Sequence, residues 1–262
     1  MCYNLGNHAK ELDRKIMSMY NHEPRATSHE PAEFDAVAQN YSDIVDDDLS
    51  VALKGNPHEY FNQYKLYYLR KILAAQKLDH ASPLKILDYG CGVGLLSQAL
   101  FHEIQDITLH GFDVSEESIR NVPDELRINS NLFTSRLDDL DNDYDAALLV
   151  TVLHHVLPKS ERHTVMQNIY SRLRPGGKLI IIEHNMKNPL TRKVVTHSEV
   201  DRDAIMLEPS ESIKLLEASG FTGISSKYIV FFPKQLACFR FMDRYISWLP
   251  LGAQYMASGI KA

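Results

Sequence analysis

A turn that contains three glycines at alternate positions is the part of the chain best suited to hold a ligand. It comprises Asp88, Gly90, Cys91, Gly92 and Gly94. A short apolar run, 84–87, precedes the turn and predicts a buried strand, and an apolar helical pattern begins at Leu95. Glycine adopts backbone angles that a Cβ would resist, and it lets a ligand approach the main chain closely. The unpaired N–H groups of the following helix can then hold a polar or anionic group.

Two classes of cofactor-binding enzyme use such a turn, and the spacing of the glycines distinguishes them. Dinucleotide enzymes have Gly-x-Gly-x-x-Gly, which Gly92, Gly94 and Ser97 match only with serine in the last position. The chain instead has an acid two residues before the first of three alternating glycines. This pattern resembles the first motif of the class I S-adenosylmethionine-dependent methyltransferases. A glycine turn that binds no ligand is the structural alternative.

The resemblance implies a second acid at the end of the next strand, where a carboxylate can accept hydrogen bonds from both ribose hydroxyls. The alternating run 107–112 is followed by Asp113, which fits this expectation. The acid alone does not discriminate between the cofactor classes, because dinucleotide enzymes place one at a similar distance. The resemblance further implies that Gly90 and Gly92 admit the methionine end of S-adenosylmethionine and that Val114 packs on the adenine. The cofactor product is then S-adenosylhomocysteine.

Strands and helices alternate along the chain, which predicts an α/β fold with a doubly wound sheet. The family resemblance implies a Rossmann-like, mostly parallel seven-stranded sheet with an antiparallel last strand, and helices before the first strand that fold over the cofactor. We therefore expect an N-terminal extension over 1–32, a helical lid over 33–80 that contributes Tyr41 to the cofactor site, and a methyltransferase core over 81–262. Aromatic core packing is the alternative role for Tyr41.

The third predicted strand, 132–135, departs from the family pattern. The family usually places an acid at its end to meet the adenine amino group, whereas Ser135 occupies that position here. We expect the adenine contact to come from Ser135, Arg136, Leu137 or the main chain, with Asp138 as a further candidate.

The fourth predicted strand, 144–151, ends at Thr151 and is followed closely by His154 and His155. Carboxyl ends of parallel strands line the ligand crevice, so we expect Thr151 beside the cofactor and His155 beside the substrate. A histidine can take a proton from a substrate hydroxyl or an acidic carbon, which makes His154 the candidate catalytic base. The alternative is that His154 only shapes the pocket and proximity alone promotes the reaction. We expect no metal site, because adjacent histidines do not share a helix face and no third ligand has metal spacing.

Polar residues concentrate after the fifth predicted strand, 178–183, which follows a Leu-Arg-Pro-Gly-Gly turn that also resembles the family. The candidate substrate-binding residues are Glu183, His184, Asn185 and Arg192. Such a concentration after a strand's carboxyl end indicates a substrate-binding insertion over about 184–208. The Glu-His-Asn and Asn-Pro-x-Thr-Arg patterns resemble a subgroup of bacterial small-molecule methyltransferases. A surface loop with hydrogen-bonded turns is the alternative.

Composition limits the classes of partner. A formal net charge of −6 argues against a nucleic-acid backbone as the main partner, since phosphate binding needs a clustered basic face. A small molecule is the better substrate class. No run approaches the roughly 18 apolar residues of a membrane helix, so we expect no stable membrane insertion. Charged residues among the first twenty, and three cysteines without paired or metal-ligand spacing, favour a cytoplasmic protein.

The aromatic-rich segment 234–248 has three interpretations. Its amphipathic pattern favours packing on the core or a contact between two copies of the chain in a homodimer. Contact with a membrane surface or a lipid-like substrate is the third interpretation.

These features together predict transfer of the methyl group of S-adenosylmethionine to an O, N or C nucleophile of a small molecule. A nicotinamide-dependent oxidoreductase is one rival, disfavoured by the glycine spacing and by the lack of a Tyr-x-x-x-Lys pair after the fourth strand. A non-catalytic module that binds the cofactor to sense or scaffold is the other. The glycines and Asp113 are compatible with that module too, because they argue for binding and not for turnover.

Overall fold

The computed structural model describes residues 57–77, 83–198 and 200–262. These residues belong to one compact unit, Ala32–Ala262. The expected extension over 1–32 and the candidate Tyr41 lie outside the described residues.

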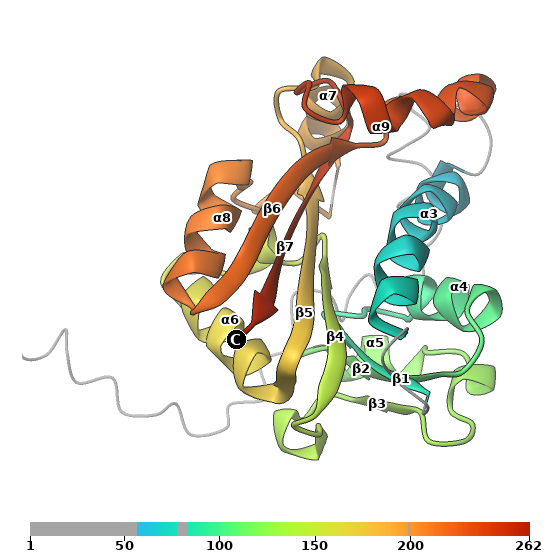
Figure 1. Ribbon diagram of the computed structural model, residues 1–262, viewed down its shortest axis with the longest axis vertical. Coiled ribbons are helices and arrows are strands. Elements are labelled where there is room, and N and C mark those ends of the chain that lie inside the picture. Colours follow the sequence, from blue (N-terminus) through green and yellow to red (C-terminus); the bar gives the residue numbers. More distant parts are fainter. Residues whose placement is uncertain (1–56, 78–82, 199) are drawn as a thin grey trace, which may run out of the picture. The chain divides into compact units, whose positions relative to one another are not determined.

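The described residues form a seven-stranded sheet in the order β3-β2-β1-β4-β5-β7-β6 (Figure 1). Its strands are β1 (Leu84–Tyr89), β2 (Ile107–Phe112), β3 (Leu132–Thr134), β4 (Tyr144–Val150), β5 (Leu173–His184), β6 (Phe221–Ile229) and β7 (Gln254–Lys261). The first five strands pair in parallel, while β7 runs antiparallel between β5 and β6. The predicted Rossmann-like fold with an antiparallel last strand is confirmed.

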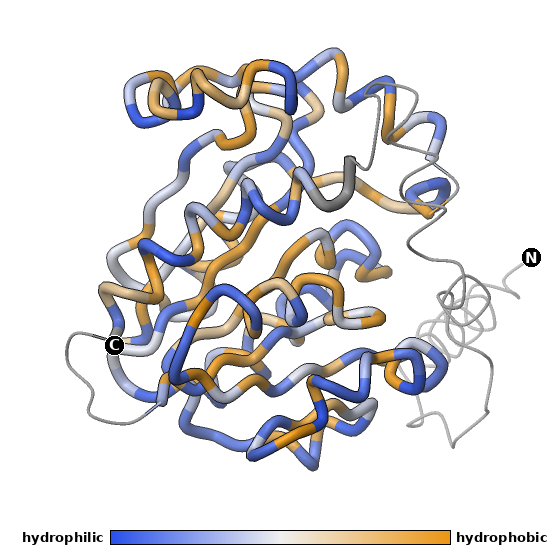
Figure 2. The backbone as a smooth tube through the Cα atoms, turned by 90° about the vertical axis from the view of Figure 1, so that its right-hand side faces the viewer, coloured by the Kyte–Doolittle hydropathy of each residue, from blue (hydrophilic) through white to orange (hydrophobic). Residues whose placement is uncertain are grey.

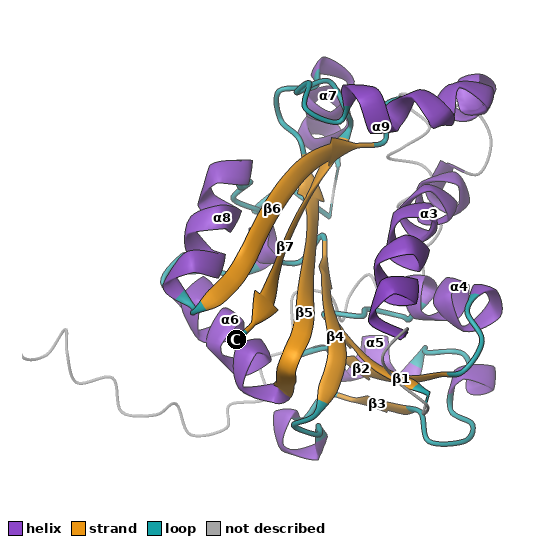
Figure 3. Cartoon of the chain, viewed as in Figure 1, coloured by secondary structure: helices purple, strands orange, loops and turns teal. Residues whose placement is uncertain are grey.

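Helices cover both faces of this sheet (Figure 3). The α-helices are α3 (Pro57–Lys77), α4 (Leu95–Glu103), α5 (Glu116–Arg120), α6 (Glu161–Arg172), α7 (Pro189–His197), α8 (Pro209–Ala218) and α9 (Asp243–Ile246). Short 3₁₀ helices are η2 (Asp124–Leu126), η3 (Leu137–Asp139), η4 (Leu153–His155) and η5 (Lys234–Met242). Within the described ranges, no helix is both long enough and apolar enough to cross a membrane.

Alternation along the strands divides the core into two layers. On β5, Ile180 and Ile182 pack toward α3 and α4, whereas Leu179 and Ile181 pack toward α6 and α8. Both pairs are fully buried, and each such side chain contributes roughly 1.5–3 kcal/mol of hydrophobic stabilisation. Figure 2 shows apolar stretches of the backbone running through the middle of the fold. A sheet buried on both faces leaves its carboxyl edge as the place where polar side chains can converge.

Two elements differ from the sequence-based expectation. The Pro-Gly-Gly turn lies inside β5, because Leu173 already pairs with Tyr144 and the register then shifts before Ala146. Gly176, with φ of +77°, allows the bend. The segment 234–248 forms η5, which is kinked at Leu236, followed by the short helix α9, and is not one amphipathic helix.

The aromatic side chains of 234–248 are more exposed than core packing would allow. Phe241, Tyr245 and Trp248 are 60%, 61% and 73% exposed, so core packing is the wrong interpretation for these three. The segment consists of a 3₁₀ helix and a four-residue α-helix, so its apolar residues do not form the single face that one continuous α-helix would have presented to the core.

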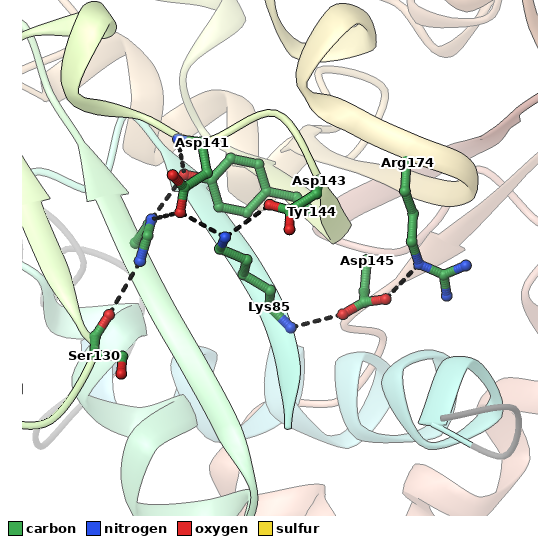
Figure 4. A network of polar contacts seen from close by, with 8 residues as sticks. Lys85, Ser130, Asp141, Asp143, Tyr144, Asp145 and Arg174 are labelled. Atoms are coloured by element: carbon green, nitrogen blue, oxygen red, sulfur yellow. Dashed lines mark hydrogen bonds and ion pairs between the residues drawn. The ribbon is translucent and has the colours of Figure 1, made fainter. Parts of the chain in front are cut away.

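A polar network joins the amino ends of the central strands (Figure 4). Nζ of Lys85 on β1 lies 2.5 Å from Asp141 and 2.7 Å from Asp143, just before β4. Asp145 on β4 accepts hydrogen bonds from the Lys85 main-chain N–H and from Arg174 on β5. The network therefore ties β1, β4 and β5 together at the edge opposite the glycine turn.

Candidate active site

A cavity of about 660 Å³ lies at the carboxyl edge of the parallel strands. Its volume is typical of a small-molecule site. The predicted site residues that line it are Asp88, Gly90, Cys91, Gly92, Asp113, Val114, Thr151, His154, His155 and His184. Residues 60–62 and Lys65 of α3 form part of its wall. The fold thus brings together candidates that are separated by up to a hundred residues of sequence.

Other predicted site residues lie outside the cavity lining. These are Gly94, Ser135, Arg136, Leu137, Glu183, Asn185 and Arg192. The Asn185 side-chain amide donates to the carbonyls of Pro250 and Gly252, and Arg192 is exposed on α7. Their expected ligand contacts stay predictions.

The three glycines of the turn all adopt positive φ angles, of 80° at Gly90, 53° at Gly92 and 83° at Gly94. A Cβ at Gly90 would meet Cγ2 of Val152 at 2.5 Å, whereas a Cβ at Gly92 would meet no atom within 4 Å. Packing therefore requires glycine at position 90, and at position 92 the glycine leaves open space beside the main chain. A ligand can approach the backbone closely at Gly92.

Asp88 lies below this turn and is almost completely buried. It accepts a hydrogen bond from Oγ of Ser97 at 2.7 Å. Burial raises the pKa of Asp88 to about 6, although Ser97 and Lys65 partly oppose the rise. Burial likewise lowers the pKa of Lys65 to about 8, against the attraction of Asp88 and Glu183. Lys65 was missed by the sequence analysis, although it is a lone cation in the aromatic run of α3.

Asp113 is held at the end of β2 by two main-chain donors. Its Oδ2 accepts from the N–H of Gly92 at 2.8 Å, and its Oδ1 accepts from the N–H of Ser115 at 2.9 Å. Ser115 in turn caps the amino end of α5. These bonds fix the carboxylate beside the glycine turn, and the 67% exposed side chain of Val114 follows it into the cavity.

His154 is fully buried in η4 with a carboxylate near each ring nitrogen. Its Nδ1 donates to Oε2 of Glu183 at 2.5 Å, and its Nε2 lies 3.2 Å from Oδ1 of Asp201. The other oxygen of Glu183 accepts from the N–H groups of Leu153 and Val152 at 2.8 and 3.2 Å. Burial alone would lower the pKa of His154, but Glu183 and Asp201 outweigh burial and raise it to about 10.

Asp201 and His184 complete this end of the cavity. Oδ1 of Asp201 also lies 3.4 Å from Nε2 of His155. The His184 ring is centred 5.3 Å from that of His154, and burial lowers the pKa of His184 to about 4. Glu183 and His184 are neighbours at the end of β5 and so point to opposite faces of the sheet. The sequence analysis did not single out Asp201, although it lies within the predicted insertion.

Two β-branched residues with positive φ angles border the cavity. Thr151 follows β4 with φ of 56°, and Val230 follows β6 with φ of 63°. Such angles are rare for β-branched residues and cost of order 1–3 kcal/mol. Backbone strain of this kind concentrates at functional sites, which agrees with the placement of the polar residues.

Comparison with known proteins identifies the domain. Residues 87–179 match the family model of a methyltransferase domain. A ubiquinone biosynthesis O-methyltransferase from Coxiella burnetii is 31% identical over 155 residues, which cover 56% of this chain and 62% of that protein. The chain thus matches somewhat less than two thirds of the length of this curated relative.

Solved structures share the fold at low sequence identity. An S-adenosylmethionine-dependent methyltransferase from Archaeoglobus fulgidus superimposes with a TM-score of 0.57 at 18% identity, covering 76% of this chain and 94% of that chain. The magnesium protoporphyrin IX methyltransferase of Synechocystis PCC 6803, with bound S-adenosylmethionine, has a TM-score of 0.52 at 17% identity and covers 90% and 100%. The methyltransferase-domain match over 87–179, the strand order and the acid-flanked glycine turn all agree with the class I S-adenosylmethionine-dependent methyltransferases, which this chain resembles in sequence and fold.

Proposed function

We propose that the protein transfers a methyl group from S-adenosylmethionine to an O, N or C nucleophile of a small molecule, in the cytoplasm. The observation that carries this proposal is that a single cavity is lined both by the glycine turn with Asp113 and by His154 with Asp201. We call the first part its cofactor end and the second part its acceptor end, after their proposed roles.

The residues of the cofactor end fit S-adenosylmethionine. Gly92 leaves room for the methionine portion against the main chain, since a Cβ there would project into open space. Asp113 presents an oriented carboxylate to the ribose hydroxyls, and Val114 offers an exposed apolar side chain to the adenine. When bound, the cofactor would supply a methyl group on a positively charged sulfur. The buried carboxylate of Asp88 would add negative charge beneath the glycine turn that holds such a cation.

α3 gives the site an apolar wall. Tyr60 and Phe61 line the cavity next to Lys65, which is consistent with the proposed role of 33–80 as a cover over the site. Excluding water and aligning the nucleophile with the methyl group supply much of the rate enhancement in this kind of transfer.

His154 and its neighbours are proposed to face the acceptor. Glu183 fixes the His154 ring with Nε2 directed toward Asp201, and both Asp201 and His184 line the cavity. His154 would act as a general base on the acceptor's proton in the deprotonated fraction of the protein, and the raised pKa of His154 makes that fraction grow as the pH rises toward 10. The Coxiella relative is named as an O-methyltransferase, which favours a hydroxyl among the three acceptor types.

The test is a calorimetric titration of the full chain with S-adenosylmethionine, S-adenosylhomocysteine and NAD in parallel. We expect micromolar binding of the first two compounds and its loss in Asp113→Ala. Asp124→Ala removes an exposed carboxylate of η2 that does not line the cavity and should bind normally, which controls for the loss of charge.

Binding of NAD in place of the sulfur compounds would overturn the proposal in favour of an oxidoreductase. Tight cofactor binding without methylation of a broad panel of acceptors would favour the non-catalytic module.

A further inference from the structure

We propose that His154, His184 and Asp201 bind a divalent transition-metal ion at the acceptor end of the cavity. The three residues come from η4, from the end of β5 and from the segment between α7 and α8. One potential ligand atom from each lies within 4.8 Å of the corresponding atoms of the other two. The donors are two imidazoles and one carboxylate.

The spacing of these atoms suits a common ion between them. Metal bonds to histidine nitrogen and carboxylate oxygen are about 2.0–2.2 Å long, so donors around a tetrahedral ion lie about 3.4 Å apart. Nε2 of His154 and Oδ1 of Asp201 already lie 3.2 Å apart, and ligand atoms within 4.8 Å of one another would have to close by at most about 1.4 Å. Two histidines and one carboxylate hold zinc or iron in many enzymes and leave coordination positions open for a substrate.

A second observation points to a ligand at the same place. Nε2 of His154 is buried and, among the described residues, has no partner in hydrogen-bond geometry, although Asp201 lies 3.2 Å away. Its other ring nitrogen is bound by Glu183, whose second oxygen is anchored by main-chain N–H groups. A histidine that ligates a metal almost always donates its other N–H to a carboxylate or carbonyl in this way.

No metal site was expected from the sequence, because the two neighbouring histidines, His154 and His155, do not share a helix face. The fold instead places His184 beside His154, because β4 and β5 are neighbours and both end at this edge of the sheet. Asp201 then supplies the third donor from the insertion. Ligands drawn from three separate segments have no short spacing for a sequence pattern to detect.

The ion would define the class of acceptor, and this part of the inference rests on the proposed function. Open coordination positions on the ion would bind an acceptor hydroxyl. An acceptor with two neighbouring oxygens would bind best, because both oxygens can coordinate the same ion. A coordinated hydroxyl loses its proton to solvent more readily, because the ion stabilises the resulting oxyanion. In that state His154 serves as a ligand and not as the base.

The experiment titrates the full chain, first stripped with a chelator, with Zn²⁺ in a calorimeter and with Co²⁺ followed by visible absorption. We expect one site whose affinity falls at least tenfold in both His184→Ala and Asp201→Asn. Glu183→Gln should weaken it about 10- to 100-fold, because Glu183 orients the His154 ring. His102→Ala is the matched control, since His102 is exposed and paired with Glu125.

Unchanged affinity in both His184→Ala and Asp201→Asn would overturn the inference. Retained binding of S-adenosylmethionine by these variants shows that they are folded; if His184→Ala fails to fold, Asp201→Asn alone decides. The two proposals fail separately. Cofactor binding without a metal site would contradict the metal proposal and leave the methyltransferase proposal standing. A metal site without cofactor binding would contradict only the methyltransferase proposal.

Discussion

Gly90 and Gly92 share a left-handed backbone but have different surroundings, and alanine should separate their roles. Gly92→Ala should cost about 1–2 kcal/mol of unfolding free energy for the backbone alone, and it should weaken cofactor binding because its methyl group occupies ligand space. Gly90→Ala should cost about 1–3 kcal/mol more, because the new Cβ would lie 2.5 Å from Val152. Urea unfolding and cofactor calorimetry on both variants measure the two effects. Equal stability of the variants would contradict the packing argument.

Asp88 should make the stability of the protein depend on pH. Its pKa is raised from 3.8 to about 6 on folding, so the folded state binds the proton more tightly than the unfolded state does. The stabilisation is complete below pH 3.8 and is lost as the pH rises through about 6; a shift of two units corresponds to about 3 kcal/mol. The unfolding free energy of Asp88→Asn should not show this decrease as the pH rises. Parallel urea unfolding curves at several pH values measure the difference, and identical slopes would refute the assignment.

At the residue scale, local motifs were predictable and long-range partners were not. The spacing of Asp88, the glycines and Asp113 follows from one strand, turn and helix, so it can be read from sequence. Lys65 reaches the same cavity from α3, and Asp201 reaches it from the insertion. Their positions depend on packing between distant segments, which no local pattern encodes.

At the element scale, the C-terminal segment holds α3 in place. The Asp243 carboxylate is buried and accepts hydrogen bonds from the hydroxyls of Tyr64 and Tyr68 on α3. The guanidinium of Arg240 lies 4.7 and 4.6 Å from the ring centroids of Tyr60 and Tyr64, within cation–π distance. Since α3 walls the cavity, these contacts link the C-terminal segment to the cofactor site.

Removing one hydroxyl from this contact tests the link. Tyr68→Phe should lower the unfolding free energy by about 1.5–3 kcal/mol, because the buried carboxylate of Asp243 loses a donor at 2.7 Å. It should also weaken cofactor binding through a less firmly held α3. Tyr67→Phe removes the neighbouring, exposed hydroxyl and should change stability by less than about 0.5 kcal/mol. Chemical unfolding and calorimetry compare the two variants; equal effects would disprove the role of Asp243.

Elements with a strong apolar pattern were predictable, and elements shaped by tertiary contacts were less so. The predicted strands 84–87, 107–112 and 144–151 coincide closely with β1, β2 and β4. β5 begins earlier than its apolar run because Leu173 pairs with Tyr144 across a register shift, which only the neighbouring strand determines.

At the scale of the whole molecule, one edge of the sheet forms the binding cavity and the opposite edge contributes to stability. The carboxyl edge holds the cavity, and the amino edge holds the network of Lys85, Asp145 and Arg174 (Figure 4). Asp145→Asn should therefore lower the unfolding free energy by about 1.5–3 kcal/mol while leaving cofactor affinity unchanged. Asp113→Asn should weaken cofactor binding and also cost some stability, because its amide can accept only one of the two main-chain N–H bonds that the carboxylate accepts. Thermal unfolding and calorimetry distinguish them, and an affinity loss in Asp145→Asn would show that the edges are coupled.

The architecture as a whole was the most predictable level. Alternating strands and helices with short connections leave few arrangements of a parallel sheet. The resemblance of the glycine turn then implied seven strands with an antiparallel last one, which β7 confirms. The acceptor end of the cavity was the least predictable part, because it gathers η4, the end of β5 and the insertion at one point.

The end of β5 has an evolutionary consequence. Glu183 supports His154 from one face of the sheet, and His184 enters the cavity from the other. Deleting or inserting one residue in the strand would exchange the two faces and remove both contacts at once. Selection can therefore lengthen, shorten or diversify the segment after His184 far more freely than the strand itself, and new acceptor preferences are expected to arise there.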